Sequence, residues 1–317
     1  MNRREIIAGL GGVAAWPYTH AWAQQIDRVR RVGILSFGAD FELIRTVLRD
    51  ELAKRGWIEN RNVQLDFRFG YDERQTYAFA ADLVRLAPDV IVTVYASALR
   101  AAQQQTKTIP IVFAGGGDPL QNGMVSNPAR PEGNVTGLSR SFGSLGGKWL
   151  ELLKEITPNI TRIAYLWRGV APYRSVETAA QLLGVQANLI MVSDVDALRA
   201  AVEGFAAKPN GGLIFSPGQI SFGPPELIRL AAQYRIPAVY GGPLAPDGGL
   251  LCYYPEFTEV LRGAAGYVDR LLHGAKVSDL PVQYPTHFHL AINLKTARAL
   301  GLNVPQSILL RADEVIE

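Results

Sequence analysis

The chain has 317 residues, 48% of them hydrophobic, and its 32 lysines and arginines against 29 acidic residues give a formal net charge of +3. These values exclude a disordered or fibrous chain, and the length suffices for two domains of ordinary size. Because the basic residues are spread along the sequence rather than clustered, we expect a small ligand and no nucleic-acid partner.

The first residues have the features of an export signal. Arg3 and Arg4 precede a mostly apolar run that ends in an A-x-A pattern at Ala21 to Ala23, so residues 1–23 are predicted to be removed on export. The adjacent arginines favour twin-arginine export, and the general secretory route is the alternative. No later run approaches the roughly 18 apolar residues that span a bilayer, so the mature protein is expected to be soluble and periplasmic.

Strands and helices alternate along the first half of the chain. Short apolar runs rich in β-branched residues predict strands at 32–36, 63–69, 90–94, 109–113 and 135–138, and helical periodicity predicts helices at 41–55, 75–86 and 97–105. This alternation is typical of a parallel, doubly wound α/β sheet.

The same alternation starts again in the second half. Helices are predicted at 147–155, 175–183, 195–206, 225–234, 257–272 and 294–300, and strands at 163–167, 186–192, 212–216, 238–240, 250–253 and near Val282. A second lobe is therefore expected, and the cleft between two such lobes is the natural place for a ligand.

Polar and aromatic residues follow the predicted strands, at the edge where open α/β sheets bind ligands. The candidates in the first lobe are Ser36, Phe37, Asp40, Tyr95, Ser97, Gly117 and Asp118, and those in the second are Arg168, Tyr173, Pro217, Gly218, Gln219, Tyr240 and Gly241. Aromatic rings there could stack on a ligand, while Ser97, Arg168 and helix N-termini hold a carboxylate and Asp118 holds an ammonium group.

Two glycine-rich stretches fail as nucleotide sites. The turn at 114–119 lacks the G-x-G-x-x-G pattern, and the stretch at 143–148 has Phe142 where a phosphate loop needs glycine and Trp149 where it needs serine or threonine. No serine, histidine and aspartate stand in hydrolase order either. We therefore expect no cofactor and no enzymatic activity.

Histidine and cysteine carry no site of their own. His287 and His289 alternate on a predicted strand, but no cysteine or carboxylate lies nearby in sequence, so a solvated or core-edge pair is favoured over a metal site. Cys252 is the single cysteine and has no disulfide partner, so it is predicted to be a buried, unreactive thiol.

Five stretches, at residues 87–139, 146–167, 208–217, 247–255 and 280–317, resemble the ABC transporter substrate-binding proteins of the tryptophan/tyrosine type. The resemblance implies the type I periplasmic-binding-protein fold, in which two Rossmann-like lobes are joined by three crossovers. These would lie near Ser139, Tyr253 and Leu280. One lobe would comprise residues 30–139 and 253–280, and the other residues 140–252 and 281–317.

The resemblance also implies which loops touch the ligand, namely those with Ser36, Phe37, Ala96, Ser97, Gly117, Asp118, Ser139, Arg140, Ser141, Pro217, Gly218, Gln219, Tyr240 and Gly241. It implies a monomeric receptor that presents its ligand to an ABC permease in the inner membrane. Arg140 and Arg168 make an aromatic carboxylate a serious rival to an amino acid as ligand. Two other functions stay open: an exported Rossmann-like enzyme, suggested by Asp118 beside a glycine turn, and a ligand-sensing partner of a membrane receptor.

Overall fold

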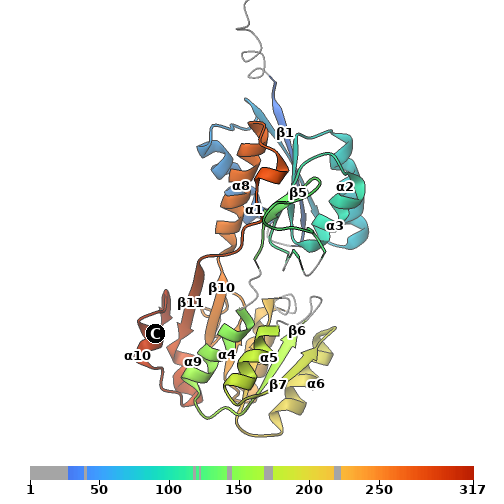
Figure 1. Cartoon of the computed structure of the whole chain (residues 1–317). Coiled ribbons are helices and arrows are strands. Elements are labelled where there is room, and N and C mark those ends of the chain that lie inside the picture. Colours follow the sequence, from blue (N-terminus) through green and yellow to red (C-terminus); the bar gives the residue numbers. More distant parts are fainter. Residues whose placement is uncertain are drawn as a thin grey trace, which may run out of the picture.

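Two β-sheets organise the molecule and lie end to end (Figure 1). The computed structural model describes residues 28–38, 41–116, 119–120, 123–140, 145–167, 174–217 and 223–317. We call the first sheet with its helices lobe 1 and the second sheet with its helices lobe 2. The predicted export signal, residues 1–23, lies outside the described residues.

Lobe 1 is built on a parallel sheet in the order β2-β1-β3-β4-β5. Its strands are β1 (Arg30–Phe37), β2 (Val63–Gly70), β3 (Val90–Val94), β4 (Ile111–Ala114) and β5 (Val135–Leu138). One face is covered by α1 (Phe41–Lys54) and α8 (Phe257–Leu272), the other by α2 (Glu73–Arg85) and α3 (Ala96–Gln105). The central strand β3 is buried along its whole length, because helices cover both of its faces.

Lobe 2 is built on a sheet in the order β12-β11-β10-β9-β8-β6-β7. Its strands are β6 (Arg162–Trp167), β7 (Gln186–Met191), β8 (Gly211–Phe215), β9 (Ala238–Tyr240), β10 (Leu251–Pro255), β11 (Phe288–Asn293) and β12 (Glu314–Ile316). The core on one face includes α4 (Leu145–Ile156), α5 (Arg174–Leu182), α9 (Leu294–Leu300) and α10 (Gln306–Leu309), and the core on the other includes α6 (Val195–Ala206) and α7 (Pro224–Gln233).

Side-chain caps fix where several of these helices begin. The Asp72 carboxylate accepts a hydrogen bond from the backbone N–H of Gln75 at 2.7 Å, and Asp194 accepts one from Ala197 at 2.8 Å. Each bond satisfies a donor in the first turn that has no partner within the helix. The starts of α2 and α6 are therefore set by local sequence.

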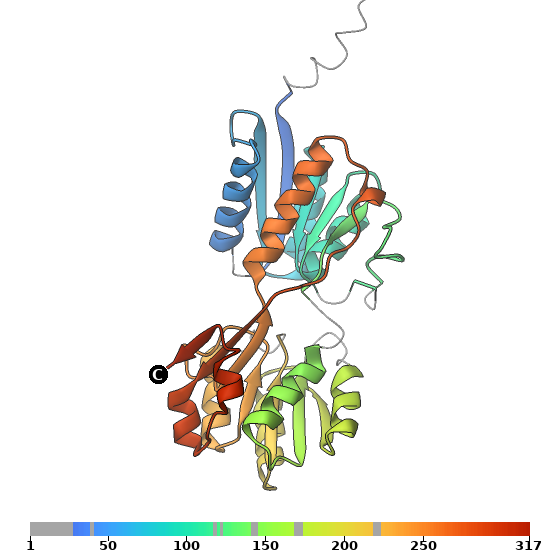
Figure 2. The same ribbon diagram turned by 60° about the vertical axis from the view of Figure 1, so that its left-hand side comes forward.

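The chain passes between the lobes three times: from β5 to α4, from β10 to α8, and from the 3-10 helix η3 (Val277–Asp279) to β11 (Figure 2). Pro255 still pairs with β11, and Gln283 still bridges to β5. The second and third passages therefore follow Pro255 and Gln283, a few residues later than the crossovers expected near Tyr253 and Leu280.

The predicted fold class is confirmed, with three differences in detail. First, β10 and β11 are antiparallel, whereas the other described strand pairs are parallel. Second, the strand expected near Val282 is wrong: this residue is buried and its N–H donates to the Pro128 carbonyl at 2.7 Å, in an irregular segment. Third, α10 and β12 were not expected from the sequence.

The predicted burial of Cys252 is confirmed. Its side chain is fully buried in lobe 2, and burial raises the pKa of the thiol to about 12, so the reactive thiolate is scarce at neutral pH. Over the described parts of the chain, we find no helix that combines the length and apolar character needed to cross a membrane.

Candidate functional site

The carboxyl edge of the lobe 1 sheet brings together those predicted site residues of this lobe that the structure describes. The register places Ser36 of β1 beside Val94 of β3, Val94 beside Ala114 of β4, and Ala114 beside Leu138 of β5. The predicted residues that follow these positions therefore share one edge: Phe37, Tyr95, Ala96, Ser97, Ser139 and Arg140.

Lobe 2 has a smaller group of described site residues at the carboxyl edge of its own sheet. The N–H of Gly241 donates to the carbonyl of Phe215 at 3.0 Å, which holds the loop after β9 against the end of β8. A Cβ atom on Gly241 would lie 2.7 Å from Cδ of Pro217 and 2.9 Å from the Trp149 ring. The two predicted site residues Pro217 and Gly241 are thus packed against each other.

Three predicted site residues are buried more deeply than the edge position suggested. The ring of Tyr240 is 2% exposed and stacks on Phe215 with centroids 5.1 Å apart, and its burial raises its pKa. The expectation that this ring faces a ligand is therefore wrong. Ser36 and Ser139 are also buried, and the Ser36 hydroxyl has no hydrogen-bond partner among the described residues.

The remaining predicted site residues lie outside the described residues. They are Asp40, Gly117, Asp118, Ser141, Arg168, Tyr173, Gly218 and Gln219.

Tyr95 has a strained backbone at the start of α3. Its φ of 72° and ψ of 159° are unusual for a residue other than glycine, and it provides no side-chain cap to the helix. Next to it, a Cβ atom on Gly116 would lie 2.9 Å from the Ala96 nitrogen. Strain of this kind clusters at functional sites, and a helix N-terminus favours negative charge. This edge therefore suits an anionic group of a ligand.

A stack of three side chains stands at the same edge. The Tyr95 and Phe257 rings have centroids 5.7 Å apart and an interplanar angle of 21°, and the guanidinium carbon of Arg140 lies 4.7 Å from the Phe257 centroid. Phe257 was not among the predicted site residues, although a helix was predicted to begin there. An aromatic residue that opens a helix directly after a passage between lobes is the signal that could have found it.

A second aromatic group lies at the end of β2. The rings of Phe41 and Phe69 have centroids 5.5 Å apart, and the Arg45 guanidinium lies 5.4 Å from the Phe67 centroid and 5.8 Å from that of Phe69. Phe69 is the register partner of Ser36. Lobe 1 thus carries two groups of rings with a cation at the carboxyl edge of its sheet.

His289 lies between two carboxylates. Its Nδ1 lies 3.6 Å from Glu256 and its Nε2 lies 3.5 Å from Glu314. Among the described residues, no group of three or more His, Cys, Asp or Glu side chains could hold a metal ion. His287 precedes β11 and is exposed.

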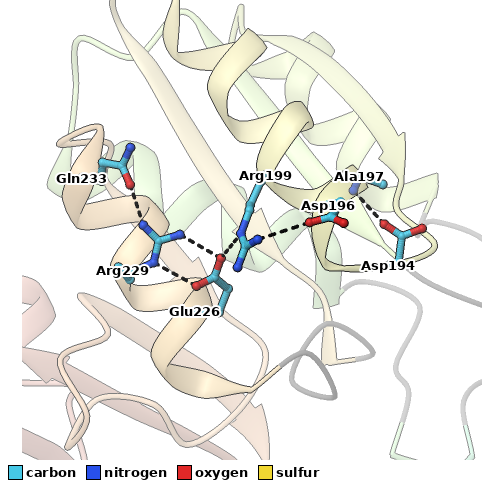
Figure 3. Close-up of polar contacts among 7 residues, drawn as sticks. All are labelled: Asp194, Asp196, Ala197, Arg199, Glu226, Arg229 and Gln233. Carbon is cyan, nitrogen blue, oxygen red and sulfur yellow. Dashed lines mark hydrogen bonds and ion pairs between the residues drawn. The ribbon is translucent and has the colours of Figure 1, made fainter.

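A charged network joins the starts of α6 and α7 at the carboxyl edge of lobe 2 (Figure 3). Glu226 accepts hydrogen bonds from Arg229 at 2.8 and 2.9 Å and from Arg199 at 2.6 Å, and Arg199 also reaches Asp196 at 3.2 Å. These bonds, first that from Arg229 and then that from Arg199, lower the pKa of Glu226 from 4.5 to about 2. The network ties the first turn of α6 to the first turn of α7.

We expect Glu226→Gln to lower the free energy of unfolding at pH 7 by about 1 kcal/mol, since both arginines are half exposed and solvent screens their charge. The pKa of Glu226 is lower in the folded state. Its stabilising effect is therefore complete above pH 4.5 and is lost as the pH falls towards 2. Urea unfolding between pH 7 and 3 should show wild type and variant converging in acid. Asp196→Asn, at an 86% exposed side chain, is the matched control, and equal curves for both variants would contradict the prediction.

Two open hollows in the described part of the surface lie away from these edges. One, lined by Lys107, Arg130 and Lys276 among others, lies by the turn before β4 and the end of α8. The other, lined by Lys208 and Asn210 among others, lies by the turns before β6, β8 and β9. Both are at the amino ends of the strands, so they are separate from the strand-end site.

The chain is similar to proteins of one family over most of its length. The family model described as ABC transporter substrate binding protein matches residues 34–316. A tyrosine-binding protein of Clostridioides difficile strain R20291 is 24% identical over 259 residues, which cover 79% of this chain and 74% of that protein.

Solved structures have the same fold. A domain from Streptococcus pneumonia in complex with L-Trp matches with a TM-score of 0.82 and 24% identity, over 90% of this chain and 99% of that one. A conserved domain protein of Vibrio cholerae O1 biovar El Tor also has a TM-score of 0.82 and 24% identity, over 91% of this chain and all of that one.

Proposed function

Because the chain belongs to the family of ABC transporter substrate-binding proteins, we propose that it is a periplasmic receptor for an aromatic amino acid or a small aromatic carboxylate. The ligand would lie between the carboxyl edges of the two sheets and touch both lobes. The relatives that bind tyrosine and L-Trp support this ligand class.

One observation carries the proposal: rings and guanidinium groups stand together where the lobe 1 strands end. Tyr95, Phe257 and Arg140 form one such group beside the N-terminus of α3. Aromatic faces suit the ring of a ligand, and a guanidinium beside a helix N-terminus suits its carboxylate. A neutral sugar carries no negative charge, so it would interact less favourably with the cation and with the helix N-terminus.

Binding would work by closure of the two lobes. Residues 30–138 with α8 would move as one lobe and the second sheet with its helices as the other, about the three passages between them. A ligand that touches both lobes favours the closed state by its higher affinity for that state. The protein would change no covalent bond in the ligand.

Membership of this family also suggests where the bound ligand would be delivered. A monomeric, exported protein of this kind would carry its ligand to an ABC permease in the inner membrane. Residues 1–23 would direct export and be removed.

Titration of the purified protein with L-tryptophan, L-tyrosine and indole-3-acetate tests the proposal. We expect at least one of them to raise the free energy of unfolding by about 2.7 kcal/mol when present at 100 times its dissociation constant. Thermal unfolding detects the effect, and calorimetry gives the constant itself.

D-Ribose and glycine serve as ligand controls, since neither has an aromatic ring. Stabilisation by ribose with none by the three aromatic compounds would contradict the proposal. Consumption of a bound aromatic compound, followed by chromatography, would point to an enzyme instead.

A further inference from the structure

The Tyr95–Phe257–Arg140 stack joins three segments that are far apart in sequence. Tyr95 follows β3, Arg140 lies two residues after the end of β5 on the first passage, and Phe257 opens α8 after the second passage. Their contacts are a ring–ring distance of 5.7 Å and a guanidinium–ring distance of 4.7 Å. Phe257 lies in the middle and touches both of the others.

The ring of Phe257 is fixed by the helix it belongs to. Val260, Leu261, Ala264 and Ala265 of α8 are buried in the core of lobe 1, so the first turn of this helix is anchored on the sheet. An anchored ring holds its neighbours at little further cost in side-chain entropy. Phe257 can therefore position whatever packs on it.

The aliphatic part of the Arg140 side chain packs against Gly115. A Cβ atom on Gly115 would lie 3.0 Å from Cδ of Arg140, and Gly115 has a φ of +81°, which favours glycine. The Arg140 side chain thus runs across Gly115 to the face of Phe257. A guanidinium that packs on an aromatic face stays charged, and its five N–H donors let it pair with a carboxylate in addition to its other contacts.

We propose that Phe257 is a positioning residue for the ligand carboxylate: its ring holds the Arg140 guanidinium where that group pairs with the carboxylate of an aromatic ligand. This role rests on the proposed function. It adds that the carboxylate end of the ligand lies by lobe 1, next to the first two passages, and that Phe257 acts on affinity through Arg140.

The test compares ligands with and without a carboxylate, L-tryptophan and tryptamine, by calorimetry. We expect Phe257→Leu to weaken L-tryptophan binding by about 3- to 30-fold, the range given by loss of one cation–π contact, and to change tryptamine binding less than about twofold. Phe257→Tyr should restore the wild-type ratio of the two constants. Phe257→Leu in an Arg140→Gln background should have little further effect on L-tryptophan.

Phe205→Leu is the matched control. Phe205 also packs under a guanidinium, that of Arg162 at 3.9 Å, but at the amino end of the lobe 2 sheet. This variant should lower stability and leave the ratio of the two constants unchanged. Equal weakening of both ligands by Phe257→Leu, or no weakening of either, would overturn the proposal.

Failure of the proposed function has a different signature. Wild-type protein would then bind neither L-tryptophan, L-tyrosine nor indole-3-acetate, and the role of Phe257 towards a carboxylate would fall with it. The stack itself is seen without ligand, as an upfield ring-current shift of the Arg140 Nε–H resonance that Phe257→Leu removes and Phe205→Leu does not.

Discussion

Replacement of Trp149 by alanine should lower the free energy of unfolding by about 3–5 kcal/mol, the range for loss of a large buried aromatic side chain. Trp149 lies in α4 and is fully buried. Its ring stacks with Tyr165 at a centroid distance of 6.4 Å, and its Nε1 donates to the carbonyl of Tyr253 at 2.7 Å. The substitution removes packing on α4, β6 and β10 together.

Urea unfolding followed by circular dichroism measures this effect, and two variants separate its causes. Trp149→Phe keeps most of the packing and should cost about 1–2 kcal/mol through the lost hydrogen bond. Trp57→Ala removes a tryptophan that also donates a hydrogen bond, to Asp269 at 2.9 Å, but is only partly buried, and it should cost less. A Trp149→Ala variant as stable as Trp57→Ala would show that the lobe 2 core repacks.

Gly137→Ala should destabilise lobe 1 by at least about 3 kcal/mol, at the upper end of the cost of overpacking. Gly137 lies in β5 opposite Phe113 of β4. A Cβ atom there would lie 2.2 Å from the carbonyl oxygen of Phe113 and 2.6 Å from its nitrogen. Because both of these are backbone atoms of a buried strand, the neighbour cannot rotate away and the strand pair must separate.

The matched control for this variant is Gly184→Ala. Gly184 has a φ of +64° but no atom within 4 Å of its Cβ position, so alanine there costs only the backbone strain of about 1–2 kcal/mol. The midpoints of urea unfolding of the two variants give the comparison. Equal midpoints would mean that β4 and β5 are not packed as closely as the distances indicate.

Local patterns in the sequence were enough to predict the α/β architecture. The helix predicted at residues 257–272 has these bounds in the structure, because its apolar residues recur at helical spacing and a glycine follows its end. The strand predicted near Val282 does not form, because strand formation depends on contacts that are distant in sequence. A strand needs a partner along its length, and this segment has only a single bridge, from Gln283 to Leu138.

The sequence was enough to place the candidate site at a sheet edge, but it did not show which side chains are exposed there. Tyr240 was expected to face a ligand, yet it lies in a three-residue strand that is buried on both faces, so its ring joins the core. Phe257 contacts Tyr95 and Arg140 only because the chain returns to lobe 1 after building most of lobe 2. Sequence spacing carries no information on such a contact.

That return has a consequence for the order in which the protein folds during synthesis. The face of the lobe 1 sheet that carries Val92, Val112 and Leu138 is covered by α8, which is made only after the strands β6 to β10 of lobe 2. Until α8 has left the ribosome, this part of the face stays uncovered and the N-terminal half cannot complete its core, whereas a contiguous N-terminal domain folds first. Lobe 1 therefore completes its core only after α8 has been made, when most of lobe 2 has already been synthesised.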